Sequence, residues 1–156
     1  MFLPALFHLT EPLQFSIPIF YVVELSGVAF LFGGLLLESR ADQQKSIFKT
    51  LHPQEFCNTG LYSWVRCPNY LGEILIWIGS WMMGAPFYMG PWQWVGSLFG
   101  LVCIILIMMG STKRLENDQE KRYGPLSEYQ TYIRSVPILF PFIPIYTLNK
   151  MRSKER

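Results

Sequence analysis

The stretch that decides the fold is residues 74–112, ILIWIGSWMMGAPFYMGPWQWVGSLFGLVCIILIMMGST, which contains no Asp, Glu, Lys or Arg. Residues 1–39 also contain no Lys or Arg, so all 13 basic residues lie in the stretches 40–66 and 113–156. With 51% apolar and 16% aromatic residues, this layout is typical of an integral membrane protein. Since cytoplasmic loops collect Lys and Arg, we expect the polar stretches to face the cytoplasm.

Prolines and glycines divide the apolar sequence into three candidate spans. We expect one helix over residues 19–37, beginning after Pro18, because a bilayer-crossing helix needs about 20 residues. Pro86 and Pro91 break the second apolar block into helices over 70–84 and 92–110, joined by an uncharged turn. The predicted fold is therefore an all-α, polytopic membrane helical bundle. It has about three full transmembrane helices plus interfacial segments at both ends, as a single membrane domain over 1–156.

The polar stretches are predicted to be helical where they leave the membrane. Glu38, Asp42, Lys45 and Lys49 recur at helical spacing and form one charged stripe. The helix over 92–110 is expected to continue to residue 123 and to end at Gly124-Pro125. The sequence Ser-Glu-Tyr-Gln at 127–130 has the spacing of a capping box, so we expect a short helix that ends before residue 137. The proline-broken stretch 137–144 cannot span as a helix and should lie in the interface or seal a pocket.

Residues 60–73 combine charge with a helix start. Arg66 carries a planar cation suited to phosphate or carboxylate, and Asn69 stands at a natural N-cap position. Glu73 would lie inside the membrane helix, where an acid is costly unless it is paired or hydrated. Two interpretations without a binding site stay open. The 38–49 stripe is a solvated helix face, and Glu73 pairs with Arg66 or Lys49.

Other features exclude some classes of site and partner. Cys57, Cys67 and Cys103 form no Cys-x-x-Cys pair, and His8 and His52 stand alone, so we expect neither a disulfide framework nor a metal site. A net charge of +2 gives no reason to expect a nucleic-acid partner. The basic tail 150–156 is interpreted as a topology anchor or a contact for anionic headgroups.

The chain resembles the C-terminal half of the steroid 5-alpha-reductase superfamily, and within it a branch of uncharacterised bacterial membrane proteins. The resemblance covers residues 25–141. It is carried, in order, by Ala41-Asp42-Gln43-x-Lys45-x-x-Phe48-Lys49, Gly60-Leu61-x-x-x-x-Arg66-x-Pro68-Asn69-Tyr70-x-Gly72-Glu73, Tyr123-Gly124, Tyr129, Tyr132 and Pro141.

This resemblance implies a membrane-embedded, NADPH-dependent reductase of an enone-type C=C bond in a lipid or steroid-like substrate. Hydride would pass from the nicotinamide while an acid protonates the substrate. The implied cofactor segments are 38–73 and 111–145 on the cytoplasmic side of a bacterial inner membrane. By position, the implied cofactor-binding residues are Glu38, Asp42, Lys49, Arg66, Asn69, Tyr70, Glu73, Arg122, Tyr129 and Tyr132.

The chain departs from the family pattern in two ways. Cys67 stands where the family usually has His, and Cys cannot supply a cationic contact. Full-length relatives carry further membrane helices before the Ala-Asp-Gln run, and these hold the substrate cavity and the proton donor. No catalytic residue is therefore assigned, and a homo-oligomer that completes the cavity stays open.

Two other functions compete with the reductase. Membrane methyltransferases of the isoprenylcysteine carboxyl type share a similar Arg-His-Pro-x-Tyr run, and in that reading Glu116 lies near S-adenosylmethionine. The chain is alternatively a truncated, non-catalytic paralogue, a reading that the absent N-terminal helices favour. Competition between S-adenosylmethionine and NADPH for one site separates the two enzymatic readings.

Overall fold

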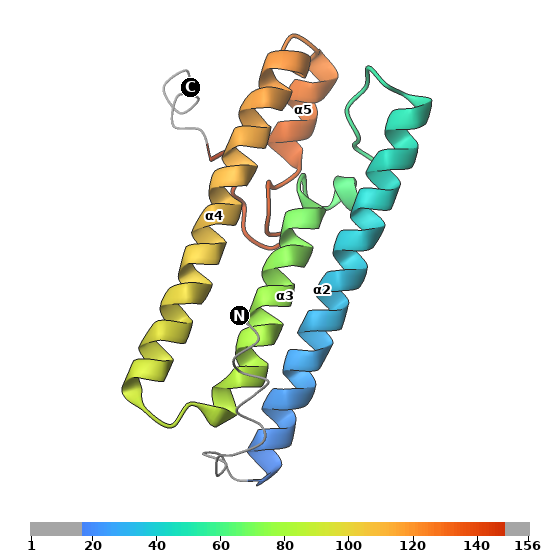
Figure 1. Ribbon diagram of the computed structural model, residues 1–156. Coiled ribbons are helices and arrows are strands. Elements are labelled where there is room, and N and C mark those ends of the chain that lie inside the picture. Colours follow the sequence, from blue (N-terminus) through green and yellow to red (C-terminus); the bar gives the residue numbers. More distant parts are fainter. Residues whose placement is uncertain (1–16, 149–156) are drawn as a thin grey trace. The chain divides into compact units, whose positions relative to one another are not determined.

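The computed structural model describes residues 17–148, and the predicted N-terminal interfacial segment and the basic tail lie outside this range. The described chain is all-α, with helices α2 (Ile17–Leu51), α3 (Pro68–Gly84), α4 (Pro91–Tyr123) and α5 (Ser127–Ser135). Two short 3-10 helices, η1 (Gly60–Ser63) and η2 (Ala85–Phe87), lie in the connections. Figure 1 shows the hairpin between α3 and α4, which confirms the predicted proline-broken turn.

Two of the helices are long and apolar enough to cross a membrane. They are α2, over Pro18–Leu51, and α4, over Pro91–Tyr123. The third expected span, α3, has 17 residues, the lower limit of the length that a crossing helix needs, and is not one of these two helices. Both long helices continue without a break from their apolar part into their charged part, as the sequence predicted.

Three details of the helix ends differ from the predictions. The described α2 begins at Ile17, so Pro18 lies in its first turn, where a proline displaces no helical hydrogen bond. Helix α3 begins at Pro68, and Leu71 N donates to Cys67 O at 3.2 Å, so Asn69 lies inside the first turn rather than at the N-cap. Leu126 is the N-cap of α5 and no side chain caps it, so the capping box at residues 127–130 does not form.

The chain divides into two compact units, which are described separately. Unit 1 contains the described residues 17–35 and 73–106, and unit 2 contains residues 36–72 and 107–148. In unit 1, α2 and α3 approach so closely that a Cβ added at Gly79 would lie 2.6 Å from Gly27 O. At the hairpin end of unit 1, the Trp81 indole donates to Ser97 Oγ at 3.2 Å and its ring packs edge-on against Trp94.

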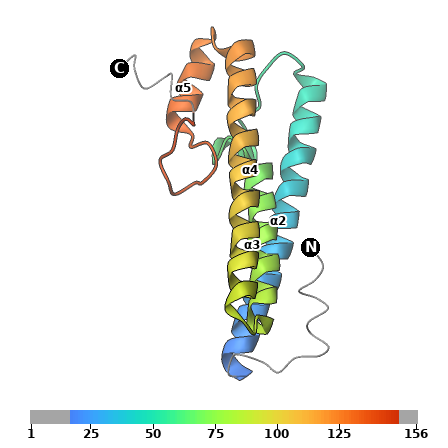
Figure 2. The ribbon, with the colours of Figure 1, turned by 60° about the vertical axis from the view of Figure 1, so that its left-hand side comes forward.

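Unit 2 is held together by two small clusters of buried side chains. Figure 2 shows α5 beside the last turns of α4, and an aromatic cluster of Phe56, Tyr123, Tyr129 and Ile133 fills this region. A second cluster contains Ala41, Cys57 and Tyr62 and joins α2 to the 57–62 connection. Nearly all of the side chains that the sequence singled out for chemistry belong to this unit.

Candidate functional site

Unit 2 contains nine of the ten residues that the resemblance implied for cofactor binding. Glu73 is the exception, because it lies on the part of α3 that belongs to unit 1. The two polar stretches therefore lie in one compact unit of the structure, although they are far apart along the chain. Within unit 2, these nine residues lie in a cavity, in a buried ion pair, in the core or on helix surfaces.

A cavity of about 270 Å³ lies between α2, the 56–62 connection and α4; we call it the cation cavity. It receives three basic side chains and one acidic side chain. Two of its cations, Lys49 and Arg122, were predicted from the sequence, whereas Lys45 was not among the predicted binding residues. The full lining is Lys45, Lys49, Phe56, Cys57, Tyr62, Leu115, Asp118, Gln119, Arg122 and Tyr123.

The Lys49 ammonium is fully engaged by the protein itself. It donates to Tyr123 Oη at 2.6 Å, to Pro53 O at 3.5 Å and to Glu55 O. An ammonium has three donors, so Lys49 fastens the turn after α2 to α4 and has no donor left for a ligand. Within the described chain, Lys45 has no hydrogen-bond or ion-pair partner, so its ammonium is available to an anion. The charged stripe with Lys45 four residues before Lys49 was the available signal.

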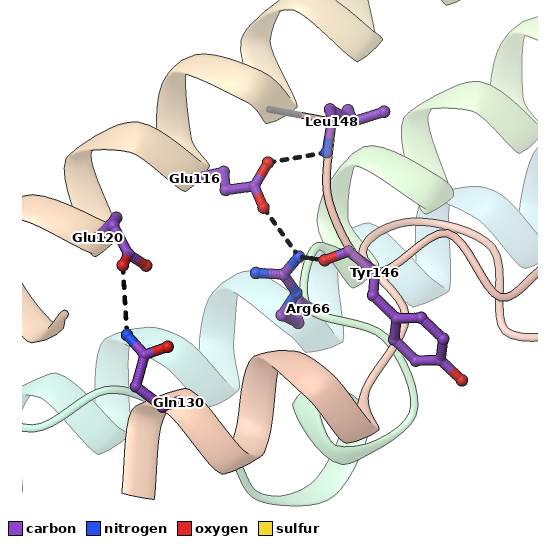
Figure 3. Close-up of polar contacts among 6 residues, drawn as sticks. All are labelled: Arg66, Glu116, Glu120, Gln130, Tyr146 and Leu148. Atoms are coloured by element: carbon purple, nitrogen blue, oxygen red, sulfur yellow. Dashed lines mark hydrogen bonds and ion pairs between the residues drawn. The ribbon is translucent and has the colours of Figure 1, made fainter. Parts of the chain in front are cut away.

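Arg66 forms a buried ion pair that the sequence did not predict. Figure 3 shows its guanidinium between the Glu116 carboxylate and the backbone of Tyr146. The Arg66 Nη2 to Glu116 Oε1 distance is 3.2 Å, and the two side chains are 2% and 4% exposed. Arg66 Nη2 also donates to Tyr146 O, and Leu148 N donates to Glu116 Oε2 at 3.0 Å. The ion-pair partner of Arg66 is therefore Glu116. One interpretation of the sequence had paired Arg66 with Glu73 instead.

The stretch after α5 closes over this pair. Arg66 N donates to Pro137 O and Cys67 N donates to Ile138 O, each at 3.0 Å. Ile138 N in turn donates to Ile145 O at 2.9 Å, so the stretch folds back on itself. The prediction that residues 137–144 do not span as a helix agrees with this arrangement, and the stretch packs against Arg66 and Cys67 rather than against either described cavity.

Two buried polar atoms near the start of α3 have no hydrogen-bond partner among the described residues. They are Arg66 Nε, a donor, and Asn69 Oδ1, an acceptor. Buried polar atoms are nearly always paired with protein, water or ligand. An unsatisfied donor and acceptor within four residues of each other therefore fit a segment that contacts a polar ligand. Both atoms belong to residues that the resemblance assigned to the cofactor.

Tyr129 and Tyr132 are core residues of unit 2. The Phe56 ring lies 5.2 Å from the Tyr129 ring and 5.3 Å from the Tyr132 ring, between ring centroids. Tyr129 is fully buried, and the Tyr132 hydroxyl donates to Tyr62 O at 2.6 Å. Burial raises the pKa of Tyr132 above its ordinary value. These contacts tie α5 to the 56–62 connection, and neither tyrosine lines the cation cavity.

The remaining predicted residues lie on helix surfaces. Asp42 is exposed on α2, while Glu38 on α2 and Tyr70 in the first turn of α3 are half-buried. None of the three lines the cation cavity. Asp42 still acts on unit 2: the pKa of Tyr62 is raised chiefly by burial, and then by Cys57 and Asp42.

Cys67 occupies the position where the related family usually has His. Burial raises the pKa of its thiol to about 12, although Arg66 and Lys45 act in the opposite direction. The thiol is therefore neutral at physiological pH and supplies no charge to the site. This agrees with the expectation from the sequence that Cys67 supplies no cationic contact to a ligand.

Comparison with known proteins gives a family and two distant relatives. A family described as "Protein of unknown function (DUF1295)" matches residues 5–136. The chain is 30% identical over 126 residues to the uncharacterized protein C594.04c of Schizosaccharomyces pombe, covering 68% of this chain and 35% of that protein. It is 28% identical over 102 residues to the lamin-B receptor of Drosophila melanogaster, covering 62% of this chain and 13% of the receptor. The chain thus spans about a third and about an eighth of these relatives, and no solved structure matches it.

Proposed function

The chain belongs to the DUF1295 family of proteins, and from this membership and the geometry of unit 2 we propose a membrane-embedded, NADPH-dependent reductase. It acts on an enone-type C=C bond of a lipid or steroid-like substrate, or forms the cofactor-binding part of such an enzyme. The distant similarity to a lamin-B receptor, a protein of the sterol reductase family, supports this class of reaction. The two long apolar helices support an integral membrane location, with unit 2 on the cytoplasmic side because it carries the basic residues.

The observation that carries the proposal is the charge of the cation cavity. Lys45, Lys49 and Arg122 face Asp118 alone, so three positive charges meet one negative charge in a partly enclosed space. Such a site attracts phosphates, since cations in a site of low dielectric stabilise an anion more strongly than in water. Its volume of about 270 Å³ lies slightly below the usual range for a whole ligand, so it suits a phosphate-bearing part of the cofactor.

The residues of unit 2 divide the work of binding. Lys45 and Arg122 would hold the phosphates, and Lys49 would keep the cavity wall in place through its three acceptors. Arg66 Nε and Asn69 Oδ1 would satisfy their missing hydrogen bonds on the polar part of the cofactor. When bound, NADPH would supply the hydride of the reduction.

The methyltransferase alternative is less well supported. S-adenosylmethionine carries a positive sulfonium, which three lining cations would repel. Glu116, which that alternative places near the cofactor, already uses one carboxylate oxygen on Arg66 and the other on Leu148 N. The excess of positive charge therefore favours the anionic cofactor.

Binding to the purified full chain in nonionic detergent tests the proposal. NADPH should quench tryptophan fluorescence with a micromolar-range dissociation constant, and S-adenosylmethionine should not compete. Lys45→Met should weaken NADPH about 10–100-fold, because one charge-assisted hydrogen bond contributes about 1.5–3 kcal/mol. Lys113→Met, at an exposed lysine of α4 outside the cavity, is the matched control. Equal affinity of the two variants would reject the cation cavity as the phosphate site. No NADPH binding at all would reject the reductase and leave a non-catalytic chain as the better interpretation.

A further inference from the structure

A second hollow of about 880 Å³ lies on a different face of α2, against the 59–64 segment; we call it the α2 groove. It is lined by twelve residues: six come from the last turns of α2, one is His52 just after α2, and five come from the 59–64 segment, which includes η1. None of the twelve lines the cation cavity. The volume is within the range of small-molecule sites, and the hollow is broadly open to solvent.

The α2 groove exposes large apolar side chains in an otherwise polar stretch. Ile47, Leu51 and Trp64 are 55%, 69% and 72% exposed, and all three line the groove. They lie outside the apolar run 19–37, so burial in the hydrocarbon core of a bilayer does not account for them. Apolar side chains gathered on one hollow, rather than scattered singly, mark a binding surface.

The wall opposite α2 is held in place before any ligand arrives. The Gln44 amide donates to Thr59 O at 2.7 Å and accepts from Leu61 N at 3.1 Å. Gly60 has a φ of +57°, and a Cβ there would lie 2.1 Å from Gln44 Nε2, so only glycine allows this approach. Tyr62 Oη donates to Ala41 O at 3.3 Å on the buried side of the same segment. A rigid wall lowers the entropic cost of binding.

The charge of the groove is one-sided. Its lining contains no Asp or Glu, and Arg40 is exposed with no hydrogen-bond or ion-pair partner within residues 17–148. His52 lies at the other end, where its Nδ1 is 3.4 Å from Glu55 Oε1. The free positive charge is therefore at the Arg40 end, three residues after the apolar run of α2 stops.

We propose that the α2 groove binds a single-chain anionic amphiphile, with its acidic headgroup on Arg40 and its apolar chain along Ile47, Leu51 and Trp64. Arg40 and Leu51 are separated by roughly 16 Å along the helix, at 1.5 Å per residue. The inference needs neither the cofactor nor a reductase activity.

Quenching of Trp64 by a dibrominated stearate, added to the full chain in nonionic detergent, tests this inference. The Trp64 signal is isolated as the difference between the natural chain and Trp64→Phe. We expect that signal to fall saturably. Arg40→Gln should weaken binding about tenfold relative to Lys113→Gln, because each exposed cation is changed without altering the core. The dibrominated stearyl alcohol, which lacks the charge, should bind about tenfold more weakly than the acid.

Five outcomes would overturn the inference. Quenching that does not saturate, or that persists unchanged in Trp64→Phe, means that the probe only partitions into the micelle. Equal affinities of Arg40→Gln and Lys113→Gln, or of the acid and the alcohol, mean that Arg40 does not hold a headgroup. Cross-linking that joins two copies through residue 64 means that a second chain covers the groove. The thermal midpoints of both Gln variants should match that of the natural chain.

Discussion

Removal of the Glu116 carboxylate should destabilise unit 2 more than removal of any exposed acid. In Glu116→Ala, the Arg66 guanidinium keeps its position at 2% exposure but loses the charge that faces it at 3.2 Å. Loss of one partner of a buried ion pair typically costs about 3–5 kcal/mol, because the other charge is left uncompensated. The acceptor of Leu148 N is lost as well, but Leu148 is half-buried and water can replace that bond. We therefore expect a loss of about 3–5 kcal/mol in the free energy of unfolding.

A double-mutant cycle separates this pair from its surroundings. Arg66→Met with Glu116→Leu removes both charges and should recover most of the stability that each single variant loses, since no buried charge is left alone. The free energy of unfolding is measured by SDS titration of the protein in nonionic micelles, with circular dichroism as the readout. Glu128→Ala, at an exposed acid of α5, is the control and should change stability by less than about 0.5 kcal/mol.

The reasoning is refuted if the coupling energy between the two positions is below about 0.5 kcal/mol, the lower limit for residues in contact. The same holds if Glu116→Ala costs no more than Glu128→Ala. Either result would mean that Arg66 and Glu116 are hydrated in solution. The 137–148 stretch would then not seal them.

Three further predictions concern backbone packing and thiol chemistry. Gly79→Ala should cost about 1–3 kcal/mol, because its new Cβ meets Gly27 O at 2.6 Å, whereas Gly100→Ala, with nothing within 4 Å, should cost nothing measurable in SDS titration. Gly60→Ala should cost at least about 1–2 kcal/mol through its left-handed backbone, and it should lower the thermal midpoint. The third prediction uses a chain in which the other two cysteines are changed to serine. Cys67 of the folded chain should react slowly with maleimide from about pH 7 to pH 9, because its pKa is raised to about 12. The SDS-unfolded chain should react faster, as pH passes the ordinary thiol pKa of about 8.5. The same raised pKa means that stability from this group is present below the ordinary thiol pKa and falls as pH rises toward 12. A folded reaction rate that levels off above about pH 8.5, as the rate of the unfolded chain should, would contradict the raised pKa and the burial of the thiol.

Local signals in the sequence were sufficient for the helices. Proline and glycine at 85–91 predicted the turn between α3 and α4, and Gly124-Pro125 predicted the end of α4. These residues act through their own backbone, so a single sequence reveals them. The errors at helix starts have the same local origin. Pro68 is the first residue of α3, so Asn69 lies one position inside the helix. In α5, Leu126 and not Ser127 occupies the N-cap position.

The partners of the charged side chains could not be predicted in this way. Arg66 and Glu116 are 50 positions apart, and only the packing of unit 2 brings them together. Lys49 donates its hydrogen bonds to backbone carbonyl groups and a phenol. A contact with a backbone carbonyl cannot be predicted from a pattern of side chains. Composition and spacing did indicate which segments would converge. They did not indicate which cations would be consumed by the protein and which would stay free.

The coordination of Lys49 has one consequence for how an anion would be captured. Its three acceptors are neutral oxygens, so its positive charge is not cancelled although its donors are occupied. A charge of this kind speeds the encounter with an oppositely charged molecule without touching it. Lys49 would thus act on the association rate of the anion. Lys45, which has no hydrogen-bond or ion-pair partner among residues 17–148, would act on its dissociation rate.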